Sequence, residues 1–382
     1  MLLSDLPSEI LALIGRYLLA ESLRALTLTC RYFFLVYQPA LVRFNAEAHA
    51  WGWTPLSLVA RHGHDAIVEL LLSDPREDPD KCDREGETAL FWAARCGQAS
   101  IVRRLLATNR VNPSGKNRQY QTPLYGAVSR GQTGTAGLLL DTPGVELNCS
   151  DEWGRTPFWI AAAQGHISTV EFLLAAPTID INRPDDTGKT PFIAAAMHRR
   201  EEVVAVLAKE MRVDLRARDK HGRTALSWAA VKGYQGVVRL LLNIAQLDPG
   251  SRDLEGRTPL AHAAWYGHTA TVSLLANLEG VDVNSRDHLG RTPLFLAVIN
   301  GRYDVVHHLC NRADVEQGVI DSTGQTLRMA AQDNEDRTML ALLGSFNLRT
   351  EEPPPLAARD FLHIAGFVIA LIALCWQISS LI

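Results

Sequence analysis

One short pattern in this sequence contains the residue types of a phosphate-binding loop. Gly188, Lys189 and Thr190 have the order in which such a loop ends, but the loop also needs a glycine where this chain has Arg183. Neither the nucleophile motif Gly-x-Ser-x-Gly nor the zinc-protease motif His-Glu-x-x-His occurs. The sequence therefore predicts no nucleotide site and no catalytic residues, and we expect that the protein is not an enzyme.

A second pattern consists of histidines, the residues that most often bind metals. His64, His166 and His268 share one place in a recurring pattern, which indicates a structural role. No two histidines have zinc-ligand spacing with a third ligand nearby. We expect no metal site and no cofactor.

A third pattern is a basic side chain that recurs in five successive copies of a turn. A row of cations could bind an acidic ligand, but carboxylates of the same turns stand close in sequence, such as Asp151, Asp219 and Asp287. We therefore favour structural ion pairs over a ligand site. The recurring cations are Arg155, Lys189, Arg223, Arg257 and Arg291.

A repeat of 34 residues must position these side chains. A threonine and a leucine 17 residues after it each recur nine times without a slip. A fixed period of this size predicts a solenoid, in which each unit buries its apolar face by stacking on its neighbours. The threonines are Thr54, Thr88, Thr122, Thr156, Thr190, Thr224, Thr258, Thr292 and Thr326.

Each repeat contains the signals of a turn and two helices. In the unit that starts at Asp253, the aspartate and Gly256 predict a turn, and Thr258 and Pro259 predict a helix N-cap and first helical residue. A glycine ends this first helix in seven units, and Tyr120 replaces the turn glycine in one. A second helix follows, as at 237–242, with apolar residues at helical spacing.

The repeating unit consists of a turn, a helix, a second turn and a second helix, and its first helix opens with Thr-Pro-Leu. In these features residues 46–348 resemble the ankyrin repeat. The resemblance implies an all-α ankyrin-repeat solenoid of nine helix-turn-helix units with β-turn fingers, which binds a protein ligand. The family varies at the turn tips and first-helix ends, so we expect ligand-binding residues there. They are Trp51, Arg95, Trp153, His221, Trp265 and Tyr266, whereas Trp92, Trp159 and Trp228 are expected to pack inside.

Two units depart from the repeat pattern. In the ninth, Arg328, Gln332 and Glu335 replace an apolar residue, a small residue and the helix-ending glycine, as a terminal unit without a further neighbour requires. In the third, Gly134 and Gly137 fall inside the second helix. Since glycine costs about 0.8–1 kcal/mol against alanine in a helix, we expect the third unit to be a point of low stability.

Residues 1–45 do not fit the repeat and predict two or three short helices. This segment resembles an F-box in three features: its opening around Leu6 and Pro7, its later leucines, and its final Cys30-Arg31-Tyr32-Phe33. That family docks a Skp-type adaptor of a cullin–RING ubiquitin ligase, whereas the alternative is a helical cap on the solenoid. The residues that the resemblance implies to face the adaptor are Leu6, Pro7, Ile10, Leu11, Ile14 and Leu18.

The last 34 residues predict a linker and a membrane span. Prolines 353–355 stiffen residues 349–360, and residues 361–382 contain no charged side chain. Twelve of those 22 residues are Leu, Ile, Val or Phe, so the segment is long and apolar enough to cross a bilayer. We expect a single-pass membrane protein whose repeats face the cytosol. The alternative is a cytoplasmic protein whose tail docks on the last repeat.

Composition narrows the partners and the compartment. A net charge of -4 disfavours nucleic acid as a partner, and the six scattered cysteines fit a reducing compartment. Because residues 1–7 have neither a basic region nor a long apolar run, we expect no secretory signal there. The whole chain thus resembles fungal F-box and ankyrin proteins, which implies a membrane-anchored substrate-recognition adaptor of a ubiquitin ligase. The alternative is a membrane-attached ankyrin scaffold with no ubiquitin role.

Overall fold

The computed structural model describes residues 52–73 and 77–346, which fold as nine pairs of helices. Within these residues there are no strands, so the expected all-α class is confirmed for this part of the chain. The chain divides into two compact units, one ending at Lys220 and one starting at His221, and each is described by itself.

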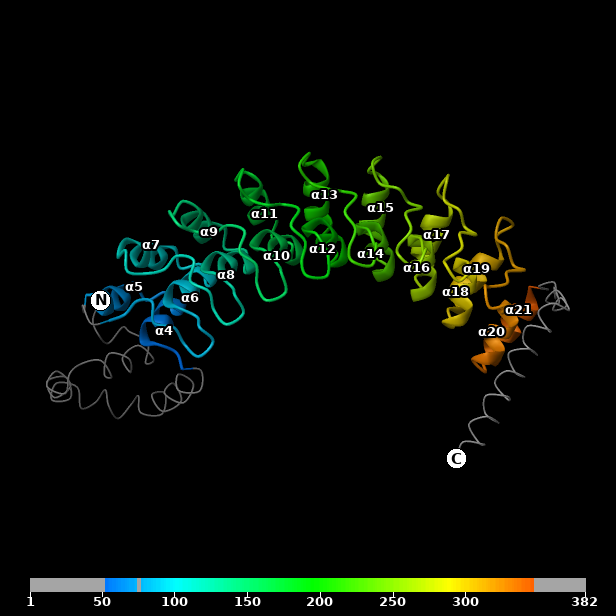
Figure 1. Ribbon diagram of the computed structural model, residues 1–382, viewed down its shortest axis with the longest axis horizontal. Coiled ribbons are helices and arrows are strands. Elements are labelled where there is room, and N and C mark those ends of the chain that lie inside the picture. Colours follow the sequence, from blue (N-terminus) through cyan, green and yellow to red (C-terminus); the bar gives the residue numbers. More distant parts are fainter. Residues whose placement is uncertain (1–51, 74–76, 347–382) are drawn as a thin grey trace, which may run out of the picture. The chain divides into compact units, whose positions relative to one another are not determined.

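The first unit contains five helix pairs. The first helices of successive repeats pack on one another, as do the second helices, and turns project beside the first helices (Figure 1). The first helices are α4 (Pro55–His62), α6 (Ala89–Arg95), α8 (Pro123–Ser129), α10 (Pro157–Gln164) and α12 (Pro191–Met197). The second helices are α5 (Asp65–Leu72), α7 (Ala99–Ala107), α9 (Thr133–Leu140), α11 (Ile167–Leu174) and α13 (Glu201–Lys209).

The second unit contains four helix pairs with the same packing. The first helices are α14 (Ala225–Lys232), α16 (Pro259–Tyr266), α18 (Pro293–Ile299) and α20 (Leu327–Asp333). The second helices are α15 (Gln235–Leu242), α17 (Thr269–Ala276), α19 (Tyr303–Cys310) and α21 (Arg337–Ser345).

The recurring threonine begins each first helix, as the sequence predicts. In α10, Thr156 has extended backbone, its side chain accepts from the N–H of Trp159, and Pro157 follows as the first helical residue. All nine threonines make this N-cap bond, which satisfies one of the free N–H groups at the helix start.

The glycines that end the first helices are needed for two reasons. Each of the seven has a left-handed backbone, with φ between 64° and 84°. Each also lies against the next repeat, and a Cβ on Gly233 would lie only 2.5 Å from Nδ1 of His268. Arg199 and Glu335 occupy the same place without glycine and take φ of 60° and 54°.

The recurring histidines are part of these contacts between repeats. The imidazole Nε2 of His268 donates to the carbonyl oxygen of Val231, 2.9 Å away, at the end of the preceding first helix. His166 donates in the same way to Ser129 over 3.3 Å, and Arg200 takes the role one repeat later by donating to Ala163. The interpretation of this register as structural is therefore confirmed for His166 and His268.

The core consists of small and branched side chains on the inner faces of the helices. Ala161, Ala162, Ala263 and Ala264 are fully buried, which lets neighbouring helices approach closely. The ninth repeat carries exposed side chains at Arg328 and Gln332, as expected for a terminal unit.

The predicted F-box-like segment (1–45), the linker (349–360) and the predicted membrane span (361–382) lie outside the described residues. Among the helices that the structure describes, none has both the length and the hydropathy to cross a membrane.

Candidate recognition surface

Hydrogen bonds fix the turn that precedes each first helix, and we call this turn a finger. In the finger of α16, Oδ1 of Asp253 accepts from the N–H groups of Glu255 (3.0 Å) and Arg257 (2.8 Å). The backbone N–H of Asp253 donates to the carbonyl oxygen of Arg257 over 3.0 Å, which closes the turn. This is the aspartate–glycine turn that the sequence predicts.

Neighbouring fingers are also joined to one another. In the first unit, the N–H of Asp186 donates to the carbonyl oxygen of Trp153 over 2.9 Å. In the second unit, the N–H of Leu254 donates to the carbonyl oxygen of His221 over the same 2.9 Å. Side chains at the finger tips are therefore held on a backbone with little freedom to lose on binding.

Three of the five recurring cations, Arg155, Arg257 and Arg291, form structural ion pairs with finger carboxylates, as the sequence favours. Arg155 pairs with Asp151 of its own finger at 2.6 Å. Nε of Arg291 instead reaches Oδ2 of Asp321 in the next finger, 3.4 Å away. Nε of Arg257 likewise lies 3.9 Å from Oδ2 of Asp287. These carboxylates are nearly fully buried. Arg155 therefore braces its own finger, whereas Arg257 and Arg291 link neighbouring fingers.

Two predicted ligand-binding residues lie in the described part of the first unit. Trp153, at a finger tip, is 48% exposed, and the guanidinium carbon of Arg155 lies 4.2 Å from its ring centroid. Arg95, in the last turn of α6, is half-buried and lies 3.5 Å from Oε1 of Glu87. Trp51 lies outside the described residues.

The other three predicted residues lie in the second unit. His221 is exposed at a finger tip. Tyr266 ends α16, is 45% exposed and stacks on His268 with 6.5 Å between ring centroids. Trp265 is half-buried beneath Arg257, whose guanidinium carbon lies 4.5 Å from its ring centroid.

The tryptophans expected to pack inside do so to different degrees. Trp159 is buried, and its indole N–H donates to the carbonyl oxygen of Lys189 over 2.8 Å. Trp92 and Trp228 are half-buried. The indole N–H of Trp92 donates to Oδ2 of Asp83 over 3.1 Å, so its orientation is fixed while one part stays accessible.

Sequence reasoning missed Tyr120, the most exposed aromatic residue in the part of the chain that the structure describes. Tyr120 stands where the other repeats have the turn glycine, and it takes the same left-handed backbone, with φ of 61°. Its side chain is 59% exposed, so burial does not offset the cost of that conformation. The signal was present in the sequence, because Tyr120 is the one departure from glycine at this register.

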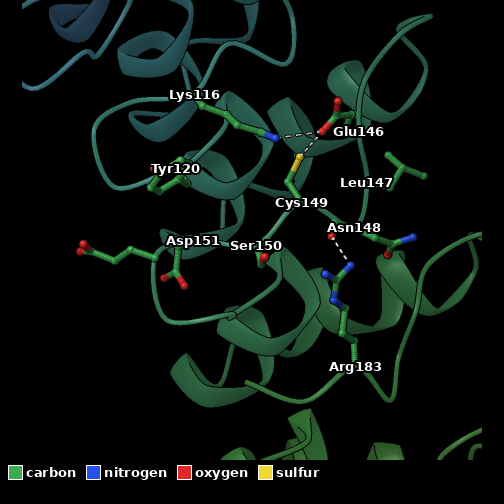
Figure 2. A pocket seen from close by; sticks show the side chains of 10 residues that line it. Lys116, Tyr120, Glu146, Leu147, Asn148, Cys149, Ser150, Asp151 and Arg183 are labelled. Atoms are coloured by element: carbon green, nitrogen blue, oxygen red, sulfur yellow. Dashed lines mark hydrogen bonds and ion pairs between the residues drawn. The ribbon is translucent and has the colours of Figure 1, made fainter. Parts of the chain in front are cut away.

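A cavity of about 650 Å³ lies between the fingers and the loops of the third to fifth repeats (Figure 2). Lys116 and Cys149 both approach one oxygen of Glu146, at 3.2 Å and 2.8 Å, and Arg183 donates to the carbonyl oxygen of Asn148. Burial, and then the hydrogen bond to Glu146, raise the pKa of the Cys149 thiol to about 12. A thiol that stays protonated is a poor nucleophile, so this arrangement does not support catalysis.

No group of His, Cys, Asp and Glu side chains in residues 52–73 and 77–346 is arranged to hold a metal ion. His262 and Asp253 form a buried pair with 2.7 Å between Nε2 and Oδ2. Burial opposes ionisation of Asp253, but its hydrogen bonds from His262 and from the finger backbone outweigh burial and lower its pKa. The pair links α16 to its finger and is structural.

Comparison with known proteins agrees with the repeat geometry. The family model described as ankyrin repeats (3 copies) matches residues 28–114, 109–185, 179–253 and 243–319. The first match begins inside the segment predicted to be F-box-like. No curated protein matches the chain.

Proposed function

This chain belongs to the ankyrin-repeat family, and from that premise we propose that the finger tips of its first unit bind a protein ligand. Ankyrin repeats are protein–protein interaction modules, and a scaffold of this kind binds unrelated partners through the side chains it displays. The ligand site must therefore be argued from the exposed residues of this chain.

The observation that carries the proposal is a pair of exposed aromatic side chains on adjacent fingers. Tyr120 and Trp153 are 59% and 48% exposed. The two fingers are joined by the N–H of Glu152, which donates to the carbonyl oxygen of Gln119 over 3.1 Å. Tyrosine and tryptophan are among the residues that contribute most to binding energy in interfaces, and rigid positioning reduces the entropy lost on binding.

We extend the proposal to the residues predicted from sequence. We propose that Arg95 belongs to the recognition surface of the first unit, and that His221, Trp265 and Tyr266 form a recognition surface of the second unit by itself. Tyr266 is the strongest of these because it is exposed at a helix end. Trp265 is the weakest because Arg257 covers one face of its ring.

Quantitative capture tests the proposal. The tagged full chain is incubated with an extract of its source cells, and bound proteins are quantified by mass spectrometry. Trp153→Ala should weaken binding of the specific ligand by about 2 kcal/mol, or roughly thirtyfold, without lowering the unfolding midpoint. Met211→Ala is the control because Met211 is 98% exposed on the loop after α13 and is not a finger-tip residue. Equal capture by both variants would contradict the proposed site.

We further propose that residues 1–45 present the bound protein for ubiquitin transfer. The support is the sequence pattern that opens at Leu6 and Pro7 and closes at Cys30-Arg31-Tyr32-Phe33, although the ankyrin match that begins at residue 28 overlaps its end. Replacing Ile10 and Ile14 together with aspartate should abolish capture of a Skp-type adaptor and a cullin while the melting of the repeats is unchanged. If the double variant still captures the adaptor, this role is refuted. If its melting temperature falls sharply, the segment is a cap on the solenoid, and the alternative of a scaffold with no ubiquitin role is favoured.

Membrane attachment is the remaining part of the proposal, and its support is the uncharged sequence of residues 361–382. Deleting this segment should release the protein from carbonate-washed membranes. A full-length chain that is already found in the supernatant would contradict membrane anchoring and favour the cytoplasmic alternative.

A further inference from the structure

The first two repeats contain a groove built from two tryptophans and two arginines. Trp53, Arg61, Trp92 and Arg95 line a cavity of about 510 Å³, and we call it the tryptophan–arginine groove. Glu85, Glu87, Asn117 and Gln119 of the neighbouring fingers form its other wall.

The aromatic rings of the groove hold Arg61 in place. The rings of Trp53 and Trp92 meet edge to face with 5.8 Å between centroids. The guanidinium carbon of Arg61 lies 4.8 Å from the first centroid and 4.9 Å from the second. A guanidinium that stacks on aromatic rings keeps its N–H groups in the plane of the fork, where they can bind a carboxylate with two parallel hydrogen bonds.

The two arginines occupy the same register but differ in their charge partners. Arg95 lies 3.5 Å from Oε1 of Glu87, and its guanidinium carbon lies 5.4 Å from the centroid of Trp92. Among the described residues, no carboxylate lies within ion-pair distance of Arg61. Arg61 is therefore the cation of the groove that is left for a ligand.

The opposite wall limits how much negative charge the groove accepts. Glu85 is exposed at a finger tip, and Glu87 is buried beside it. A ligand with a second acidic residue on that side would meet like charges, which is unfavourable at an interface. The groove therefore favours one carboxylate flanked by uncharged residues over a polyanion.

We propose that the tryptophan–arginine groove binds one aspartate or glutamate side chain of an extended segment of the protein ligand, with Arg61 as its ion-pair partner. Uncharged neighbours of that residue contact the rings of Trp53 and Trp92. This inference rests on the proposed function, because it specifies which ligand segment the first unit recognises.

Selection from a display library of random nine-residue peptides tests the groove directly. The full chain should enrich peptides with Asp or Glu at one fixed position and uncharged residues beside it. For an enriched peptide, Arg61→Gln should weaken binding by at least about tenfold, as expected for loss of a charged hydrogen-bonded pair. Arg61→Lys should bind more tightly than Arg61→Gln but more weakly than the wild type, because lysine keeps the charge and lacks the two parallel N–H donors of a guanidinium. Arg103→Gln removes the same charge from exposed α7 and should leave binding unchanged.

Two outcomes would overturn the groove. One is enrichment of peptides without a fixed acidic position, and the other is equal binding by the wild type and Arg61→Gln. If binding of the enriched peptides requires Trp153 and not Arg61, the proposal for the groove is wrong, whereas recognition by the finger tips is supported. If no peptide is enriched, the groove also fails, whereas the capture experiment with Trp153→Ala tests the proposed function separately.

Discussion

At the scale of single residues, Tyr120 combines an unfavourable backbone with an exposed side chain. Eight of the nine repeats place glycine at this register, with φ between 66° and 84°, and Tyr120 takes φ of 61°. A side chain in the left-handed region costs about 1–2 kcal/mol. Such outliers are enriched at functional sites, and this agrees with placing the exposed Tyr120 in the ligand site.

Replacing Tyr120 with glycine tests this interpretation of the strain. Glycine removes the backbone cost but increases the entropy of the unfolded chain by about 0.4–1 kcal/mol. Tyr120→Gly should therefore leave the free energy of unfolding unchanged or raise it by up to about 1.6 kcal/mol, while ligand binding weakens. Denaturant titration checks the first result, and a clear loss of stability would show that the tyrosine side chain supports the fold.

Cys149 shows how burial and a neighbouring carboxylate control reactivity. With its pKa raised to about 12, the thiol stays protonated at pH 8 and should react with iodoacetamide much more slowly than exposed Cys82. Glu146→Gln removes one cause of the shift and should accelerate the reaction, although burial remains. Mass spectrometry of each modified peptide gives the rates. Equal rates at Cys149 and Cys82 would contradict the packing in Figure 2.

At the scale of elements, the two glycines of α9 differ in their surroundings. A Cβ on Gly134 would meet nothing within 4 Å, whereas one on Gly137 would lie 3.2 Å from Cζ of Phe172. Gly134→Ala should therefore stabilise the protein by about 0.4–1 kcal/mol, and Gly137→Ala should gain less because Phe172 must move. Chemical denaturation measures both, and equal gains would show that Phe172 does not pack on α9 as described.

The order of elements could be predicted from the sequence because each signal is local. The threonine caps, the aspartate turns and the left-handed glycines act within one repeat, and all are found where the pattern places them. Contacts between repeats could not be predicted in the same way. Arg257 pairs with Asp287 of the next finger, which only the stacking distance reveals.

The candidate site was only partly predictable for the same reason. Trp153 and Tyr266 could be named from residue type and register, and both are exposed. Arg61 gave no such signal, because its two tryptophan neighbours are far apart in sequence and meet only when α4 and α6 pack.

At the scale of the whole molecule, the stacked repeats form a scaffold, and the exposed side chains it displays determine binding. Buried contacts between neighbouring repeats stabilise the array, so changes at exposed finger tips should alter binding and leave folding intact. The N-terminal segment and the C-terminal tail are proposed to add ubiquitin transfer and membrane attachment to that scaffold. Each of these roles can fail without affecting the ligand site.

Photo-crosslinking from defined positions tests the central claim most directly. A benzoyl-phenylalanine residue is placed at Tyr120 or Trp153 in the full chain, and at Met211 as the control because Met211 is exposed on the loop after α13. After irradiation in extract, we expect one captured protein to be crosslinked from both finger-tip positions and not from Met211. Crosslinking that is as strong from Met211, or absent from both finger tips, would contradict recognition by this surface.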